Sequence, residues 1–231
     1  MSDTLLIQQL GTRPYRETQQ AMQDFTAARD DNSIDRLWLL QHPPVYTQGL
    51  NGKAHHILEE VDIPIIQTDR GGQITYHGPG QLIMYCLIDL SRKNIGVRHL
   101  VTALEKIVVE LAATVGIEAS TRKDAPGVYV GADKLAALGL RVRHGRSYHG
   151  LSLNIDMDLG PFSHIRPCGL DDTGITQLVD LNENVSVKEI TQQLCALFCD
   201  ELGYNAPQIQ DCEHISLADL VQPSRVATAN N

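Results

Sequence analysis

The chain is poor in the features that mark membrane, secreted and nucleic-acid-binding proteins. Its apolar runs all fall short of the roughly 18 residues that a membrane-spanning helix needs. Its first residues contain neither the basic stretch nor the cleavage site of a signal peptide. Lysine and arginine number 19 against 28 aspartate and glutamate residues, and the resulting net charge of −9 argues against nucleic acid as the main partner. We expect a cytoplasmic protein that binds neither membrane nor nucleic acid.

Cysteine is scarce and lacks the spacing of a disulfide framework or a zinc site. The five cysteines are an odd number without a CxxC pair, and the histidines have no HExxH-like spacing. We therefore expect reduced thiols, no metal ion and no cofactor. Cys86, Cys195 and Cys199 fall in apolar segments typical of a core, and Cys212 is near a polar tail. Only Cys168 combines a turn-like setting with basic neighbours.

Length and composition fit one globular domain. The 231 residues are 42% hydrophobic and 20% charged, with no internal repeat or low-complexity linker. We expect residues 1–222 to form a single domain and residues 223–231 to form a flexible C-terminal tail.

Periodicity predicts both helices and strands. Helices are expected at residues 15–29, 97–115 and 187–202. Strands are expected at residues 5–9, 37–40, 63–67, 82–88, 127–130, 135–142 and 148–155. Residues 151–155 alternate apolar and polar side chains, which predicts an antiparallel strand buried on one face. Strands and helices do not alternate regularly, so we expect an α/β fold of the α+β type, with one mixed, largely antiparallel sheet packed with helices.

The densest concentration of glycine lies at residues 70–81, which read RGGQITYHGPGQ. Four glycines and a proline exclude a helix and let backbone N–H groups approach a ligand closely. No GKS or GKT follows, and the next segment is strand-like, so the stretch is neither a phosphate-binding loop nor a dinucleotide fingerprint. We interpret it as a ligand loop with Arg70 as an anchor and His77 as a donor to the ligand, against the plainer alternative of a tight turn.

Cys168 and Lys134 are the candidates for covalent chemistry. Pro167 and Gly169 flank the cysteine and predict a tight turn that exposes the thiol. Arg166, and Lys134 if the fold brings it close, supply the cation that a reactive thiolate needs. A lysine by itself is more often solvated, but a lysine drawn into a pocket can exchange protons with a substrate. The combination predicts nucleophilic chemistry on an acyl group.

Further cations lie near these residues in the sequence and are expected to crowd around the site. They are Arg141, Arg143, Arg146 and Arg166, joined by His144 and His149. Such a cluster would let acidic protein partners dock in spite of the net negative charge.

Taken together, the motifs resemble the lipoyl(octanoyl) transferases of lipoate biosynthesis. The matching segments are HPPVYTQG at 42–49, RGGQITYHGPGQ at 70–81, KLAALGLR at 134–141, HGLSLN at 149–154 and IRPCG at 165–169. Their order and spacing match from about residue 5 to residue 205. Tyr129 stands where tryptophan is expected and Leu135 where isoleucine is expected, both conservative departures.

The resemblance implies a fold, a reaction and a set of site residues. The fold would be that of biotin and lipoate protein ligases, with residues 1–222 as the catalytic domain. An octanoyl group would move from octanoyl-acyl carrier protein to a lysine on lipoyl domains of 2-oxoacid dehydrogenases and on the glycine cleavage H protein. Cys168 would hold the group as a thioester, and Lys134 would promote deprotonation of the thiol and shuttle protons. Substrate would contact Arg70, Gly71, Gly72, Gln73, Ile74, Thr75, Tyr76, His77, Ala137, Leu138, Gly139, Gly150, Leu151 and Ser152.

Two structural expectations follow for this reaction. The oxyanion of the tetrahedral intermediate needs N–H donors, for which backbone near Cys168 or at Gly71, Gly72 and Gly78 is suited. The small residues of the strand at 135–140 would make room for the acyl tail.

Three alternatives remain open at this point. An ATP-dependent lipoate or biotin ligase would share the fold but needs no nucleophilic cysteine. A thiol hydrolase would pair Cys168 with His77 or His149 and release free octanoate. A non-enzymatic acyl-binding module would retain only the pocket.

Overall fold

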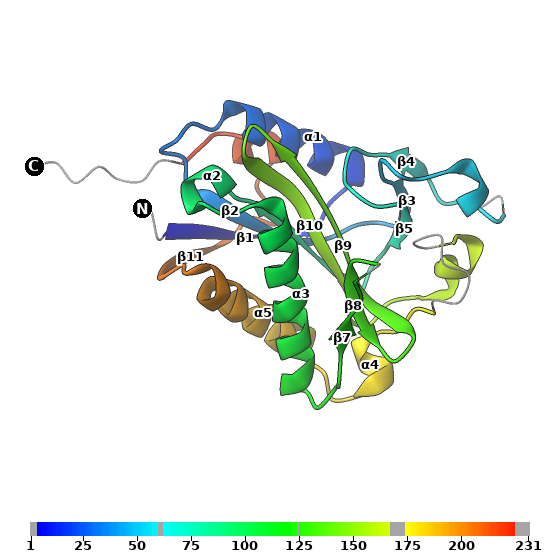
Figure 1. Cartoon of the computed structure of the whole chain (residues 1–231). Coiled ribbons are helices and arrows are strands. Elements are labelled where there is room, and N and C mark those ends of the chain that lie inside the picture. Colours follow the sequence, from blue (N-terminus) through cyan, green and yellow to red (C-terminus); the bar gives the residue numbers. More distant parts are fainter. Residues whose placement is uncertain (1–3, 60–61, 124, 167–173, 225–231) are drawn as a thin grey trace, which may run out of the picture.

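The computed structural model describes residues 4–59, 62–123, 125–166 and 174–224. Cys168 and residues 225–231 of the expected tail lie outside these residues. Within them the chain forms two sheets flanked by helices (Figure 1). In this described part, none of the helices is long and apolar enough to cross a membrane.

The larger sheet is built from strands that come from the whole length of the chain. They are β1 (Thr4–Thr12), β2 (Asp35–Gln41), β6 (Gln81–Leu87), β7 (Ser120–Thr121), β8 (Gly127–Val130), β9 (Asp133–Arg143), β10 (Arg146–Asn154) and β11 (Ala206–Asp211). Their order is β11-β1-β2-β6-β10-β9-β8-β7. β1 runs parallel to β2 and β11, and the other neighbouring pairs are antiparallel. The prediction of a mixed, largely antiparallel sheet is confirmed.

A second, small sheet was not predicted. It consists of β3 (Val45–Gln48), β4 (Ile65–Gln67) and β5 (Ile74–His77), with β3 in the middle, parallel to β4 and antiparallel to β5. The expectation of one sheet was therefore wrong. β4 falls within the strand predicted at residues 63–67. β3 and β5 are only four residues long, and β5 lies within the glycine-rich stretch, so periodicity alone does not reveal them.

Helices cover both faces of the larger sheet. They are α1 (Tyr15–Ala28), α2 (Leu90–Lys93), α3 (Val97–Thr114), α4 (Leu178–Leu181), α5 (Val187–Leu202) and α6 (Leu217–Leu220), with short 3-10 turns at Ala54–His56 and Gly160–His164. α3 and α5 lie side by side on one face (Figure 1) and share a core with the sheet. α1 and α6 pack on the other face around Trp38. The bounds of α5 match the prediction, with Ser186 Oγ accepting the Glu189 N–H at its start.

Strand alternation divides the central strands between the two faces. On β6, Met84 and Cys86 join the core under α3 and α5, whereas Ile83 and Tyr85 join the core on the α1 side. β10 is buried along nearly its whole length, so the expectation that this strand has one exposed face was wrong. The polar residues Ser152 and Asn154 are buried too, because the face that was expected to meet solvent is covered by the small sheet and the loops beside it.

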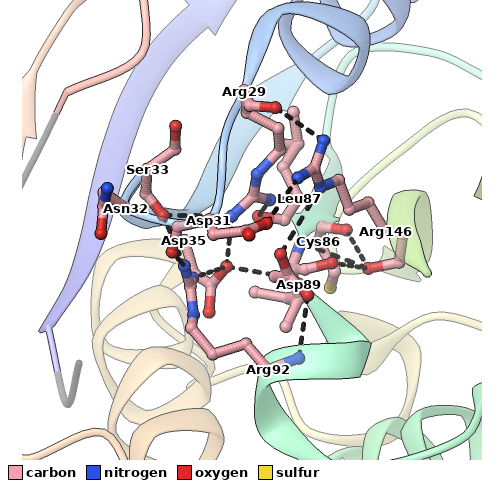
Figure 2. Close-up of polar contacts among 12 residues, drawn as sticks. Arg29, Asp31, Asn32, Ser33, Asp35, Cys86, Leu87, Asp89, Arg92 and Arg146 are labelled. Atoms are coloured by element: carbon pink, nitrogen blue, oxygen red, sulfur yellow. Dashed lines mark hydrogen bonds and ion pairs between the residues drawn. The ribbon is translucent and has the colours of Figure 1, made fainter. Parts of the chain in front are cut away.

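The hairpin of β9 and β10 is fastened at its turn by buried ion pairs (Figure 2). The turn residues His144 and Gly145 have φ of +50° and +74°, the two positive values that a tight two-residue hairpin requires. Beside the turn, Arg146 Nε lies 3.5 Å from Asp89 Oδ2, and its Nη1 donates to the Arg29 carbonyl oxygen at 2.6 Å.

Asp35 is the centre of this ionic network. Its Oδ1 lies 2.6 Å from Arg29 Nη2 and 2.6 Å from Arg92 Nη2, and it also accepts the Asp89 backbone N–H. Its Oδ2 accepts the Tyr204 hydroxyl at 2.8 Å. The network thus joins the end of α1, β2, α2 and the hairpin turn.

Candidate active site

A cavity of about 460 Å³ lies between the larger sheet, the small sheet and the start of α3. Its wall contains most of the residues expected to contact substrate, together with Lys134. They are Arg70, Gly71, Gly72, Gln73, Ile74, Thr75, His77, Ala137, Leu138, Gly139, Gly150, Leu151 and Ser152. The three sequence segments, which are far apart in the chain, are therefore brought together around one space.

Two of the expected site residues are not seen in this wall. Cys168 lies outside the described residues. Tyr76 points away into a small core, where its ring is 5.5 Å from the rings of both Tyr46 and Phe162. Tyr76 therefore packs in this core and is not among the described residues that line the cavity.

Arg70 organises the glycine-rich loop. Its guanidinium donates to the Thr47 carbonyl oxygen at 2.6 Å and to the Gln73 carbonyl oxygen at 2.8 Å, which fixes the loop to β3. The Gly71 N–H donates to the Leu140 carbonyl oxygen at 3.0 Å, so the loop also lies against β9. Because this N–H already has an acceptor, the expectation that Gly71 supplies an oxyanion donor was wrong.

The close approach of loop and strand explains a glycine in β9. A Cβ atom at Gly139 would lie 2.9 Å from the Gly71 carbonyl oxygen and 3.1 Å from Arg70 Cδ. Any side chain at this position would push the glycine-rich loop away from β9 and open a gap in the cavity wall. Gly71 in the loop and Gly139 in β9 thus allow the two backbones to pack closely against each other.

Lys134 is buried at the start of β9, with 3% of its surface exposed. Its Nζ lies 5.1 Å from the centre of the Tyr129 ring. Gly127 has φ of +148°, and a Cβ there would lie 3.2 Å from Lys134 Cε, so glycine makes room for the lysine head. The reading of Lys134 as a solvated surface lysine is therefore excluded.

The chain just after the Cys168 segment runs beside Lys134. The Lys134 N–H donates to the Gly174 carbonyl oxygen at 2.8 Å, and the Thr176 N–H donates to the Lys134 carbonyl oxygen at 3.0 Å. Asn154 Nδ2 binds the Thr176 carbonyl oxygen at 3.0 Å, which ties the same segment to β10. Cys168 precedes Gly174 by only six residues.

α3 contributes a carboxylate that sequence reasoning missed. Glu105 Oε1 accepts the Gly127 N–H at 2.9 Å. This bond fixes the start of β8, which carries both Gly127 and Tyr129 against the Lys134 side chain. A carboxylate on an amphipathic helix has no sequence signal that separates this role from solvent exposure.

The other end of the cavity is lined by aromatic rings from four elements or their ends. Tyr15, His77, Tyr85 and His149 all belong to this wall. The rings of Tyr15 and His77 stack at 6.1 Å, and those of Tyr85 and His149 meet edge to face at 5.9 Å. His42 lies behind them and binds the Tyr85 hydroxyl through Nε2 at 2.7 Å.

Burial keeps this wall neutral. It lowers the pKa of His77 well below its ordinary value and raises that of Tyr85 well above its ordinary value. Both nitrogens of His77 are already engaged, Nδ1 with Gln81 Oε1 at 2.7 Å and Nε2 with the Thr47 hydroxyl at 3.1 Å. The expectation that His77 donates to a ligand was therefore wrong, although its ring lines the cavity.

His149 is held by the carboxylate of Asp69, the residue that precedes the glycine-rich loop. Its Nε2 lies 2.9 Å from Asp69 Oδ1, and Asp69 Oδ2 accepts the Tyr148 hydroxyl at 2.5 Å. Burial raises the pKa of Asp69, but the hydrogen bonds from His149, Tyr148 and Gln23 outweigh it and lower that pKa below its ordinary value. Burial lowers the pKa of His149 in spite of Asp69, so the pair is a neutral imidazole beside a carboxylate.

The arginines expected around the site are not in the described wall of the cavity. Among the described residues, the lysine and arginine side chains that line it are Arg70 and Lys134. Arg146 is drawn into the ionic network at the hairpin turn, and Arg143 pairs opposite it in the sheet. Arg143 and Arg146 are carried away from the site because β9 and β10 are long, whereas Arg141 lies opposite Tyr148.

Known proteins match this fold and these segments. The family model of the lipoyl protein ligase A/B catalytic domain matches residues 14–199. An octanoyltransferase of Marinobacter nauticus is 53% identical over 201 residues, which cover 87% of this chain and 95% of the relative. This chain belongs to the octanoyltransferases of the lipoyl protein ligase A/B family. The prediction from the motifs is confirmed, and the protein is an acyl-transferring enzyme.

Solved structures agree with this assignment at the level of fold. A lipoate-protein ligase A bound with ATP superposes with a TM-score of 0.71 at 18% identity and covers 96% of this chain and 94% of its own. The biotin protein ligase of Aquifex aeolicus superposes with a TM-score of 0.52 at 13% identity, covering 93% of this chain and 72% of its own. The expected relation to the biotin and lipoate ligase fold is confirmed.

Proposed function

We propose that this enzyme moves an octanoyl group from octanoyl-acyl carrier protein to a lysine of lipoyl domains, in two steps through a thioester on Cys168. The acceptors are the lipoyl domains of 2-oxoacid dehydrogenases and the glycine cleavage H protein, and the reaction takes place in the cytoplasm. The observation that carries this proposal is the burial of Lys134 in the cavity wall, hydrogen-bonded to the chain that follows the Cys168 segment.

In the first step the Cys168 sulfur attacks the carbonyl carbon of the donor thioester. Lys134, as the neutral amine, takes the thiol proton and returns it to the departing pantetheine sulfur. One thioester bond forms and one breaks, so little free energy separates the two acyl carriers. The octanoyl chain occupies the cavity, whose wall includes Ala137 and Gly139.

In the second step the amine of the acceptor lysine attacks the acyl carbon on Cys168. An amide forms, the carbon–sulfur bond breaks, and the proton lost by the amine passes through Lys134 to the thiolate. Both carriers use one cavity in turn, which predicts ping-pong kinetics. The 53% identity to an octanoyltransferase supports this transfer over the ATP-dependent ligase reaction that the shared fold also permits.

The test is the intact mass of the protein after incubation with octanoyl-acyl carrier protein in the absence of ATP. We expect one added octanoyl group on the wild type, its loss when a lipoyl domain is added, and no adduct on Cys168→Ser. Transfer by Cys168→Ser at the wild-type rate would refute the thioester route. A requirement for ATP would refute the transferase reaction in favour of a ligase.

A further inference from the structure

We infer that the imidazole of His149, held by Asp69, closes the far end of the acyl-chain cavity and sets the length of chain that the enzyme accepts. The inference rests on the proposed function, since it takes the chain to be anchored at the Lys134 end. It assigns a specificity-determining role to His149, which lines the cavity, and a positioning role to Asp69, which binds His149 from outside the described lining.

The two ends of the cavity are separated along one strand pair. His149 on β10 lies opposite Leu140 on β9, and Lys134 is six residues away from Leu140 on the same strand. Six residues of strand extend about 20 Å. That span accommodates the lysine side chain, a thioester and a medium-length acyl chain end to end, so the terminal methyl group comes to rest near His149.

The wall between the two ends suits an alkyl chain. Ala137 lies opposite Ser152 and Gly139 lies opposite Gly150, so this part of the sheet presents little side-chain bulk. Ile83, the neighbour of Ser152 on β6, adds an apolar contact. A chain that lies here meets its first large rings at the far end.

The rings at the far end are fixed from behind. The Tyr15 hydroxyl donates to Thr68 Oγ1 at 3.0 Å, and the Tyr85 hydroxyl binds His42. His149 Nε2 binds Asp69, which the side chains of Tyr148, Gln23 and Gln19 also hold in place. A chain longer than the cavity must therefore break buried hydrogen bonds rather than turn a loose side chain.

His149 differs from its neighbours in two respects. Its Nδ1 is buried and has no hydrogen-bond partner among the described residues. Its backbone has φ of +58°, a conformation that is strained for a residue with a side chain and that directs this ring into the wall. The backbone of His149 therefore holds the ring in the cavity wall at the cost of strain, and Nδ1 makes no hydrogen bond to the described residues that would explain this placement.

The same φ value provides a clean test. Glycine adopts φ of +58° without strain, so His149→Gly removes the ring and leaves a backbone that fits. His149→Asn, which also tolerates positive φ, keeps a smaller polar group and serves if the glycine variant fails to fold. Tyr148→Phe is the matched control, because it removes another hydrogen bond to Asp69 from a residue that is not in the described cavity wall.

The measurement is the affinity of each purified variant for the free fatty acids hexanoate, octanoate, decanoate and dodecanoate, by calorimetry, followed by acylation with the corresponding acyl carriers. In the wild type we expect affinity to fall about tenfold or more for each acid beyond the preferred length. In His149→Gly, and to a smaller extent in His149→Asn, the preferred length moves to a longer acid. In Tyr148→Phe it does not move.

An unchanged preferred length in both His149 variants would overturn the inference, as would an equal change in Tyr148→Phe. Fatty acid binding needs no transfer, which separates this result from the proposed function. If no variant is acylated but the preferred length moves in His149→Gly, the inference about His149 is supported and the proposed transfer mechanism is refuted. If acylation occurs and its chain-length profile does not change, the mechanism stands and the end wall fails.

Discussion

The hairpin turn and the cavity are the two polar interiors of this molecule, and they are built in opposite ways. At the turn, Asp35 accepts hydrogen bonds from Arg29 and from the Asp89 N–H and forms an ion pair with Arg92 (Figure 2). It also accepts the Tyr204 hydroxyl. In the cavity wall, burial lowers the pKa of His77 and of His149, which keeps both imidazoles neutral.

The difference indicates what each region is for. Buried opposite charges that satisfy each other fix one arrangement of the chain, because removing either partner leaves an uncompensated charge. A neutral wall of rings and short side chains contains no buried charge that must be paired. Such a wall suits an uncharged alkyl chain. The charged region stabilises the hairpin, and the neutral region shapes the space that the hairpin encloses.

The largest effect is expected at Lys134, the lysine that lines the cavity among the described residues. Lys134→Met should lower the rate of octanoyl transfer by about a thousandfold, because proton transfer by a positioned group contributes on the order of 10²–10⁴-fold. Lys188→Met, at an exposed position of α5, is the control and should leave the rate unchanged. The check is single-turnover transfer together with the Tm. A normal rate in Lys134→Met would remove this residue from the mechanism.

Substitutions in the ionic network test whether the hairpin turn and the cavity are independent of each other. Asp35→Ala leaves Arg29 and Arg92 without their buried carboxylate, and we expect a loss of about 3–5 kcal/mol in the free energy of unfolding. Asp31→Ala removes a carboxylate that binds Arg146 from an exposed position and should change stability little. Urea unfolding measures both. Asp35→Ala should keep the chain-length preference of the folded protein, and a changed preference would show that the two regions are coupled.

Acid should weaken the neutral region. Burial lowers the pKa of His42 to about 4, in spite of its hydrogen bond to the Arg13 carbonyl oxygen. In the unfolded chain histidine titrates near its ordinary pKa of about 6.5. The unfolded state therefore binds a proton before the folded state does, and stability falls as the pH drops from about 6.5 to about 4, by up to about 3 kcal/mol.

The variant His42→Gln isolates this contribution. Its free energy of unfolding should depend less on pH than that of the wild type over the same interval, while the two proteins should show parallel behaviour above about pH 7. Equal pH dependence below pH 6 would contradict the assignment of a neutral buried His42. His77 and His149 shift in the same direction, so some pH dependence remains in the variant.

The sequence predicted the two regions unequally. α3, α5, β8 and the hairpin of β9 and β10 carry strong local periodicity and were found within a few residues of their bounds. The pair of Asp69 and His149 joins positions 80 residues apart, and no local pattern encodes which carboxylate a histidine meets. The motifs led to the family and to most of the cavity wall because glycine and basic residues recur there in a fixed order.

Sequence reasoning failed where a role depends on a partner. Tyr76 and His77 are adjacent polar residues in one motif, yet Tyr76 packs against Phe162 and His77 lines the cavity. Arg146 and His149 lie three positions apart, yet only His149 reaches the cavity. Strand alternation and strand length decide these outcomes, and both depend on the register of the whole sheet.

The smallest effect on transfer is expected at Glu105, a carboxylate next to the neutral cavity wall. Glu105 binds the Gly127 N–H, and Gly127 lies against the Lys134 side chain. Glu105→Ala should cost about 1 kcal/mol of stability by leaving that N–H without an acceptor, and the shift of β8 should reduce transfer by well under the roughly hundredfold loss that a 1 Å displacement can cause. Glu105→Gln keeps an acceptor and should recover most of both losses.

Glu110→Ala, on the exposed side of α3, is the control for Glu105→Ala. Stability is read from urea unfolding and transfer from single-turnover rates. If Glu105→Gln is as slow as Glu105→Ala, the negative charge rather than the hydrogen bond is what the site uses. In that case the cavity resembles the hairpin turn more than its neutral walls suggest, because a carboxylate near Lys134 would then influence the lysine directly.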